Sequence, residues 1–156
     1  MTRSIITSVN AGVATLTLSQ PEIRNAFSDV VIAEITAAFA EVGQRDDVRA
    51  VVLAAEGPAF CAGANLNWMR AMADYTREEN LADAGKLAAM LHTIATCPHP
   101  TIARVQGDVY AGGMGLVAAC DMAVAVQEAH FCLSEVKIGL IPATIGPYVL
   151  ARMGED

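Results

Sequence analysis

The chain has 156 residues, of which 54% are hydrophobic and 17% are charged, and its formal net charge at pH 7 is -7. This composition excludes a disordered chain, and the length suffices for one ordinary domain with a hydrophobic core. An acidic balance without clustered lysine and arginine argues against nucleic-acid binding, and the lack of any run of about 18 uncharged apolar residues argues against a membrane span.

The first half of the chain is predicted to contain a β-hairpin, a helix and a buried strand. Residues 4–9 and 13–18 are rich in β-branched residues, and "NAG" between them suits a tight reversal. The loop "SQPEIRNAF" then leads to a helix over about 30–43, capped by Ser28 or Asp29. The apolar run "RAVVLAAE" at 49–56 is typical of a strand that is buried on both faces.

The second half of the chain also alternates between predicted strands and helices, and a glycine-rich segment lies at its centre. The expected elements are a loop at 57–63, helices at 66–73 and 77–96, a strand at 101–106, a helix after "YAGGMG", and strands at 122–127 and 130–134. A last helix begins near Pro147, and its apolar Tyr148, Val149 and Leu150 need a partner to cover them. Strands that alternate with helices predict an α/β fold with parallel strands.

The cysteines and histidines give no support to a metal site or a disulfide framework. They are Cys61, Cys97, Cys120 and Cys132, and His92, His99 and His130. No C-x-x-C pair occurs, and the histidines are scattered. Because the N-terminus has no continuous apolar secretory segment, we expect reduced thiols in a cytoplasmic protein.

The segment "AGGMG" at 111–115 admits three interpretations. Gly113-x-Gly115-x-x-Ala118 matches a dinucleotide fingerprint, but "GDVYAG" separates it from the preceding strand, where the first glycine should lie. The glycines can instead allow a helix to pack closely against a sheet. The third interpretation is an oxyanion hole, because a glycine at a helix N-terminus presents an unobstructed N–H group.

A second glycine loop favours the oxyanion interpretation. The segment "FCAGANL" at 60–66 also follows a buried strand and opens a helix. If the two strands are parallel neighbours, both loops meet at one sheet edge, and two amides can stabilise a developing enolate. Glu135 in the apolar segment "HFCLSEVKIGLI" suits proton transfer, since burial would raise its pKa, although a pairing with Lys137 or a turn cap is the alternative.

The segments "GPAFCAGANL", "VQGDVYAGGMGLVAACDMAVA" and "FCLSEVKIGLIPATIGPYVL" resemble the enoyl-CoA hydratase/isomerase, or crotonase, superfamily, in order and in approximate spacing. The resemblance covers nearly the whole chain. Within the superfamily, "ANLNWMRAM" and "LSEVKIGLIPATIGPYV" are most similar to methylglutaconyl-CoA hydratase-like members, which act on branched acyl chains. It implies one crotonase-like domain over residues 1–156, an α/β ββα spiral with parallel sheets and outer helices, without the C-terminal helical part.

The resemblance also implies roles for particular residues. The amides of Ala64 and Gly112 would hold the thioester oxygen of an acyl-CoA, and Glu135 would transfer protons. The implied substrate- and CoA-binding residues are Arg24, Ala26, Ala62, Ala64, Asn65, Leu66, Tyr110, Gly112 and Ile138. Coenzyme A would enter as part of the substrate, with no other cofactor and no metal. A homotrimer or homohexamer is the implied assembly.

One position departs from the superfamily pattern. Many of its hydratases carry a second glutamate three residues after the oxyanion glycine, and this chain has Gly115 there. Three functions therefore stay open: a hydratase in which Glu135 performs both proton transfers, a double-bond isomerase that needs only one glutamate, and a non-catalytic acyl-CoA-binding protein.

Overall fold

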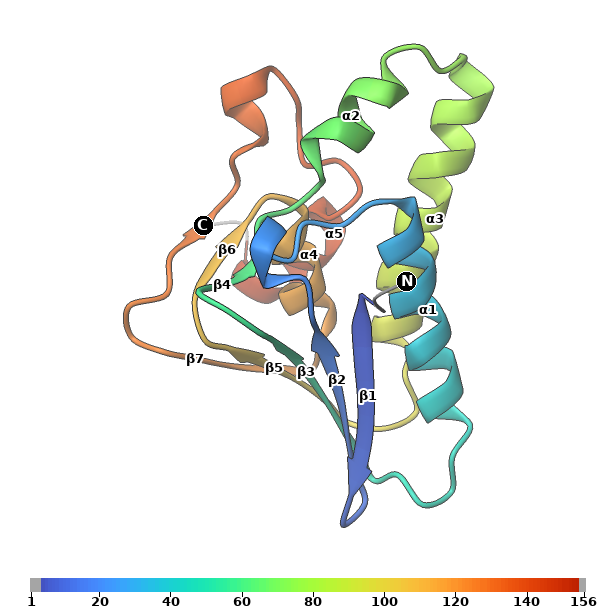
Figure 1. Ribbon diagram of the computed structural model, residues 1–156, viewed down its shortest axis with the longest axis vertical. Helices are drawn as coiled ribbons and strands as arrows, with labels where there is room; N and C mark the ends of the chain where they lie inside the picture. The colour runs from blue at the N-terminus through green and yellow to red at the C-terminus, as the bar shows by residue number, and fades with distance from the viewer. Residues whose placement is uncertain (1–3, 155–156) are drawn as a thin grey trace.

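The computed structural model describes residues 4–154 and builds them into two β-sheets with helices packed against them (Figure 1). The strands are β1 (Ile5–Asn10), β2 (Val13–Leu18), β3 (Ala50–Ala55), β4 (Ala59–Cys61), β5 (Thr101–Val105), β6 (Asp108–Tyr110), β7 (Met122–Ala125) and β8 (Phe131–Cys132). The helices are α1 (Asp29–Gly43), α2 (Leu66–Met72), α3 (Arg77–Ala95), α4 (Gly112–Ala119) and α5 (Gly146–Met153), with short 3-10 helices at Pro21–Ile23 and Glu135–Ile138. The ends of the predicted domain, residues 1–3 and 155–156, lie outside the described residues.

The large sheet has the strand order β1-β2-β3-β5-β7. Strands β1 and β2 form the predicted antiparallel hairpin, and the other neighbours are parallel. The hairpin turn consists of Ala11 and Gly12, with φ of 50° and 82°. A two-residue turn with positive φ at both positions matches the twist of the strands that it joins.

The small sheet has the order β4-β6-β8, and its strands are parallel. Each of them directly follows a strand of the large sheet, so the chain repeats a long strand, a short strand and a helical segment. This order confirms the expected ββα arrangement. The sequence analysis had assigned β4 and β6 to loops, because strands of three residues are too short to show an alternating pattern.

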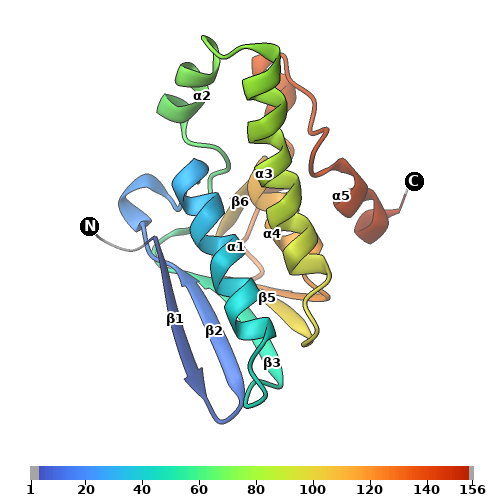
Figure 2. The same ribbon diagram turned by 90° about the vertical axis from the view of Figure 1, so that its right-hand side faces the viewer.

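Helices α1 and α3 lie side by side along one face of the large sheet (Figure 2). The buried residues of both helices recur at helical spacing, and they are Val31, Ile32, Ile35, Ala38, Phe39 and Val42 on α1 and Asp83, Met90, Leu91 and Ile94 on α3. Helix α3 begins with a capping box between Thr76 and Glu79, whereas Ser28 occupies the N-cap position of α1 without a side-chain cap bond. No helix within residues 4–154 combines the length and apolarity that crossing a membrane requires.

The strands of the large sheet differ in burial. Val51, Leu53 and Ala54 of β3 are fully buried, but Ala50, Val52 and Ala55 are partly exposed, so the expected burial on both faces is only partial. Every residue of β7 is exposed, with Val124 at 64%. Burial therefore decreases from the centre of the sheet toward its β7 edge.

Helix α5 begins at the predicted position and packs against α4. Val149 is buried at this contact, and the Arg152 guanidinium donates hydrogen bonds to the carbonyls of Ala118 and Cys120 at the end of α4. Leu150 remains 56% exposed. Helix α4 thus covers one face of α5, and the opposite face carries exposed apolar side chains.

Candidate functional site

The first glycine loop follows β4 and is held in place by Phe27. Gly63 has φ of +84°, which favours glycine, and its carbonyl accepts a hydrogen bond from the Phe27 N–H at 2.9 Å. The Asn65 N–H donates to the Phe27 carbonyl at 2.9 Å, so Ala64 pairs with Phe27 as in a parallel bridge. Because successive peptide groups of an extended chain face opposite sides, the Ala64 N–H points away from Phe27. Within residues 4–154 it has no hydrogen-bond acceptor.

The second glycine loop follows β6 and opens α4. Ala111 adopts φ of 47° and ψ of -124°, and its N–H donates to the Cys132 carbonyl at 2.8 Å. Gly112 is the first residue of α4, so its N–H has no partner inside the helix. The aligned peptide dipoles give this end of the helix a partial positive charge.

The two loops touch each other. A Cβ atom built on Gly63 would lie 2.9 Å from the Ala111 Cβ and 3.4 Å from the Gly112 nitrogen. A Cβ built on Gly112 would lie 2.5 Å from Cζ of the Phe27 ring. The strand ends that carry the loops are adjacent because β4 and β6 are parallel neighbours. The sequence analysis had instead placed the loops directly after the strands at 49–56 and 101–106, which correspond to β3 and β5 and are also parallel neighbours.

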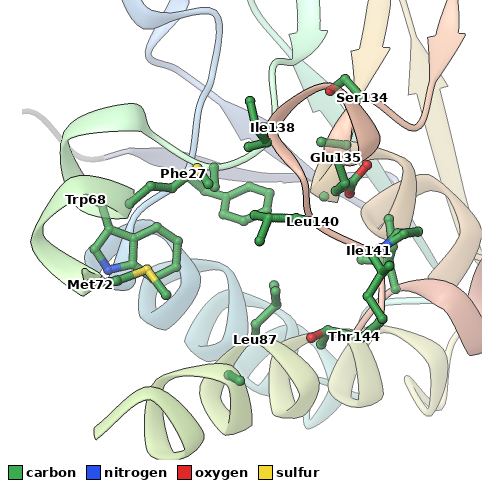
Figure 3. Close-up of a pocket in the computed structure, with 18 of the residues that line it drawn as sticks. Phe27, Trp68, Met72, Leu87, Ser134, Glu135, Ile138, Leu140, Ile141 and Thr144 are labelled. Carbon is green, nitrogen blue, oxygen red and sulfur yellow. The ribbon is translucent and has the colours of Figure 1, made fainter. Parts of the chain in front are cut away.

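A cavity of about 620 Å³ opens beside both loops (Figure 3). Ala62, Ala64 and Gly112 line it on the loop side. The other lining side chains come from α2, α3 and the segment after β8, and the principal ones are Trp68, Met69, Met72, Leu87, Glu135, Ile138, Leu140, Ile141 and Ile145. The walls are mainly apolar, which suits a hydrocarbon chain.

Glu135 lies on the wall of this cavity, at the first residue of the 3-10 helix after β8 (Figure 3). Its Oε2 atom is buried and has no hydrogen-bond partner among the described residues. The ion pairs found in residues 4–154 do not include one between Glu135 and Lys137, so the alternative of a simple surface pair has no support there. A buried carboxylate oxygen without a partner calls for an explanation, and a reaction at this position provides one.

The position of the absent second glutamate is filled by neighbouring side chains. Gly115 is buried, and a Cβ built on it would lie 2.9 Å from Cβ of Ile145 and 3.3 Å from Cδ2 of Leu91. A larger side chain at 115 would therefore displace Ile145. Glu135 is the acidic residue that lines the cavity on the side of the glycine loops, and Asp83 lines it from α3.

Polar atoms without partners also occur on the α2–α3 side of the cavity. Trp68 Nε1 and Asp83 Oδ2 are buried and make no hydrogen bond within residues 4–154. The other carboxylate oxygen of Asp83 is 3.6 Å from Lys86 Nζ. Their neighbours on this side are apolar, namely Leu66, Met69, Met72, Ala73, Ala84 and Leu87. Met69 and Met72 are therefore cavity residues.

The other predicted site residues divide into those at the cavity and those beside it. Ile138 and Leu66 line the cavity and are 58% and 65% exposed. Tyr110 is not among the lining residues, and its hydroxyl donates to Asp108 at 3.2 Å. Asn65 is not a lining residue either, and its side chain caps α2 by accepting from the amides of Asn67 and Trp68.

Arg24 and Ala26 lie in the loop before α1, outside the cavity lining. Ala26 is buried, whereas Arg24 is exposed and has φ of 54°. The Arg24 carbonyl accepts from the Ala62 N–H at 3.0 Å, which joins this loop to the first glycine loop. The loop of Arg24 and Ala26 is therefore attached to the glycine loop that lines the cavity, and the predicted role of these two residues in CoA binding stays a prediction.

Cys61 is not suited to be a nucleophile. Burial raises the pKa of its thiol to about 12, and its Sγ donates to the Asn25 carbonyl at 3.2 Å. Among residues 4–154 no group of three or more His, Cys, Asp or Glu side chains is arranged to hold a metal ion.

The sequence analysis missed two residues that hold the loops together. Asn25 is buried with φ of 53°, and its side chain bonds to Gln20, Glu56 and Ala59. Phe27 contacts both glycine loops. The available signal was the asparagine after Pro21 in "PEIRNAF", since asparagine tolerates the left-handed region better than most residues.

A model of the enoyl-CoA hydratase/isomerase family matches residues 8–155. The chain belongs to this family. The predicted superfamily is thereby confirmed. An enoyl-CoA hydratase of Alternaria alternata, AKT6-1, is 35% identical over 148 residues, which cover 92% of this chain and 46% of that protein. The mouse mitochondrial protein named enoyl-CoA hydratase domain-containing protein 2 is 32% identical, with coverage of 94% and 49%. The chain thus spans about half the length of these curated relatives.

Solved structures of enoyl-CoA hydratases have the same fold. A crystal structure from Shewanella pealeana superimposes with a TM-score of 0.95 at 42% identity, covering 97% of this chain and 57% of the other. One from Mycobacterium smegmatis gives a TM-score of 0.91 at 39% identity, covering 97% and 58%. The crotonase-like α/β fold predicted from the sequence is therefore confirmed.

Proposed function

We propose that this protein is an enoyl-CoA hydratase that adds water across the C2–C3 double bond of a 2-enoyl-CoA. The observation that carries this proposal is the meeting of two glycine loops whose residues Ala64 and Gly112 line one cavity with Glu135. The N–H groups of Ala64 and Gly112 have no acceptor within residues 4–154, so both can donate to one thioester oxygen. Each such donor contributes about 3 kcal/mol to the stability of a developing oxyanion.

In the proposed reaction, Glu135 removes a proton from a water molecule as the water oxygen forms a bond to C3 of the substrate. The electrons of the C2–C3 double bond move toward C1, and the thioester oxygen gains negative charge against the Ala64 and Gly112 amides. The enolate then takes a proton at C2 from Glu135, which returns to its carboxylate form. The net change is the addition of one water molecule, and no redox step or metal is needed.

The CoA portion would bind along the wall formed by the Arg24 and Ala62 loops. The exposed Arg24 side chain provides a positive charge for phosphate, and the backbone around Ala62 and Ala64 would receive the adenine. The acyl chain would extend past Ile138 toward Trp68 and Met72. The cavity volume of about 620 Å³ and its mainly apolar walls support including branched acyl chains in the proposal, as the resemblance to methylglutaconyl-CoA hydratase-like members predicts.

A double-bond isomerase is the second candidate, and Gly115 favours it. With Ile145 packed against Gly115, the glycine-loop side of the cavity has one glutamate. One carboxylate suffices to move a proton from C2 to C4 of a 3-enoyl-CoA, whereas many hydratases of the family hold water between two.

The test compares wild type, Glu135→Gln and the control Glu128→Gln, which alters an exposed residue outside the cavity. With crotonyl-CoA and 3-methylglutaconyl-CoA, the hydratase proposal predicts loss of the conjugated thioester absorbance. Glu135→Gln should lower kcat about 100-fold or more because it removes the proton-transfer group, and Glu128→Gln should not change it.

Other outcomes identify the alternatives. Equal rates for wild type and Glu135→Gln would remove Glu135 from the mechanism. A gain of conjugated absorbance with a 3-enoyl-CoA, without hydration of crotonyl-CoA, would identify an isomerase. Binding of both thioesters without turnover would identify a non-catalytic acyl-CoA-binding protein.

A further inference from the structure

Phe27 contacts both loops of the proposed oxyanion site through different parts of the residue. Its backbone N–H donates to the Gly63 carbonyl, and its carbonyl accepts from the Asn65 N–H, each at 2.9 Å. These peptide groups flank Ala64 on either side. The Phe27 backbone therefore fixes the orientation of the Ala64 peptide and leaves the Ala64 N–H on the opposite side.

The Phe27 side chain reaches the second loop. The ring is 1% exposed and lies against Gly112, where any added Cβ would be only 2.5 Å from Cζ. Protein interiors are close-packed, so a rigid ring at this position sets how near the N-terminus of α4 can approach the first loop. Figure 3 shows the ring on the inner wall of the cavity.

Phe27 is itself anchored to the scaffold. Two residues earlier, Asn25 Nδ2 donates to the carbonyls of Glu56 and Ala59, between β3 and β4. Ala26 is buried as well. The hydrogen bonds of Asn25 to the sheet thus set the position of Phe27, and Phe27 in turn contacts both glycine loops.

We propose that Phe27 is a positioning residue that fixes the separation of the Ala64 and Gly112 amides. The catalytic consequence rests on the proposed function, because one thioester oxygen must lie about 3 Å from both nitrogens. A shift of about 1 Å between reacting groups can lower a rate about 100-fold. Phe27 therefore contributes to stabilising the transition state more than to binding the substrate. Its replacement should lower kcat and change KM little.

The experiment compares Phe27→Leu with Phe39→Leu. Phe39 is equally buried, at 1%, but it lies on α1 and outside the cavity lining. Both changes replace a buried ring by a smaller apolar side chain, so we expect similar decreases in Tm. With crotonyl-CoA, Phe27→Leu should lower kcat tenfold or more with little change in KM, and Phe39→Leu should leave kcat within about twofold.

Two further measurements are independent of turnover. The amide resonances of Ala64 and Gly112 should shift in Phe27→Leu and not in Phe39→Leu. Acetoacetyl-CoA, a β-ketothioester that ionises to an enolate, should show less enolate absorbance when it is bound to Phe27→Leu than to wild type. The loss of the Phe27 ring current shifts the Gly112 resonance by itself, so the Ala64 resonance and the enolate absorbance are the deciding signals, and a purely structural effect on the core would change neither of these selectively.

Equal losses of kcat in the two variants, or an unmoved Ala64 amide resonance in Phe27→Leu, would overturn the proposal and leave Phe27 as a core residue. If wild type neither hydrates enoyl-CoA nor stabilises the bound enolate, the proposed function fails instead. In that case the Ala64 amide resonance alone decides whether Phe27 fixes the two loops.

Discussion

The side chain of Asn25 ties separate segments of the chain together. Its Oδ1 accepts from the Gln20 N–H at 2.9 Å, and its Nδ2 donates to the carbonyls of Glu56 and Ala59 at 2.9 and 3.0 Å. The residue is 3% exposed, so water cannot replace these bonds. Its φ of 53° adds a conformational requirement that most residues meet poorly.

Replacing this side chain should be costly for stability. Asn25→Ala removes three hydrogen bonds, and of the three backbone partners the Ala59 carbonyl also accepts from Gln106 Nε2 at 3.1 Å. At about 1 kcal/mol for each lost bond, we expect a loss of about 2 to 3 kcal/mol in the free energy of unfolding. The control Asn67→Ala alters an exposed asparagine that contacts Arg70 at 3.3 Å, and it should cost less than about 0.5 kcal/mol. Urea unfolding monitored by circular dichroism measures both. Similar losses in the two variants would contradict the structural role of Asn25.

At the scale of the elements, β8 holds the second glycine loop. The Val109 and Ala111 amides donate to the carbonyls of His130 and Cys132, each at 2.8 Å. Asp108 reinforces this pairing, because its Oδ1 accepts from the His130 N–H at 3.0 Å and lies 3.1 Å from the His130 ring nitrogen. The Tyr110 hydroxyl donates to the other carboxylate oxygen. These contacts connect β6 to β8 just before Gly112.

The contribution of the Asp108–His130 contact to stability should depend on pH. The pKa of Asp108 is lowered, mainly by the hydrogen bond from the His130 amide and further by the His130 side chain. A lowered pKa in the folded protein means that the ionised carboxylate stabilises the fold above the ordinary pKa of about 3.9, and that this contribution is lost as the pH falls through the folded value.

Asp108→Asn should therefore reduce the dependence of stability on pH in the acid range. We expect the unfolding free energy of Asp108→Asn to change less than that of wild type between pH 5 and pH 3, as measured by urea unfolding. Asp46→Asn, at an exposed residue whose side chain makes no hydrogen bond within residues 4–154, is the control and should follow the wild-type curve. If the unfolding free energy of Asp108→Asn depends on pH as that of wild type does, the contact between Asp108 and His130 contributes nothing to stability.

At the scale of the whole molecule, the exposed apolar side chains gather in the last third of the chain. The most exposed are Val124, Val136, Ile141 and Met153, which are 64%, 76%, 80% and 69% exposed. Strand β7 is an edge of the large sheet with unpaired backbone groups. Met122 of β7, Phe131 of β8 and Met153 of α5 line one cavity, so exposed apolar side chains lie beside the open edge of β7, which favours association.

We therefore expect this chain to associate in solution through the β7 and α5 side, and the resemblance to the superfamily predicts that the assembly is a trimer or hexamer. Light scattering after size-exclusion chromatography would give a mass that is a multiple of the monomer mass. Val124→Lys should shift the distribution toward the monomer, because it places a charge in the contact. Val30→Lys, at a residue of α1 with 57% exposure, should not. A monomeric wild type at micromolar concentration would contradict the expectation.

The accuracy of the sequence-based prediction differs between elements for a physical reason. The hairpin and helices α1, α2 and α3 were predicted within one or two residues, because their signals are local: hydrophobic period, caps and turn residues. Strands β4 and β6 were missed, because three residues show no period. Among the site residues, the two glycine loops and Glu135 could be found from sequence motifs, whereas the places of Tyr110 and Asn65 outside the cavity lining could not.

The sequence by itself determined the α/β class, the family and the residues that open each glycine loop, since these follow from local patterns and from the order of the motifs. Only the tertiary structure decided that Gly63 and Gly112 touch, that Ile145 fills the space beside Gly115, and that Phe27 supports both loops. These contacts join residues that lie about 30 to 85 positions apart in the chain. No local preference encodes such distances, which are set by the pairing of parallel strands and by the packing of the helices between them.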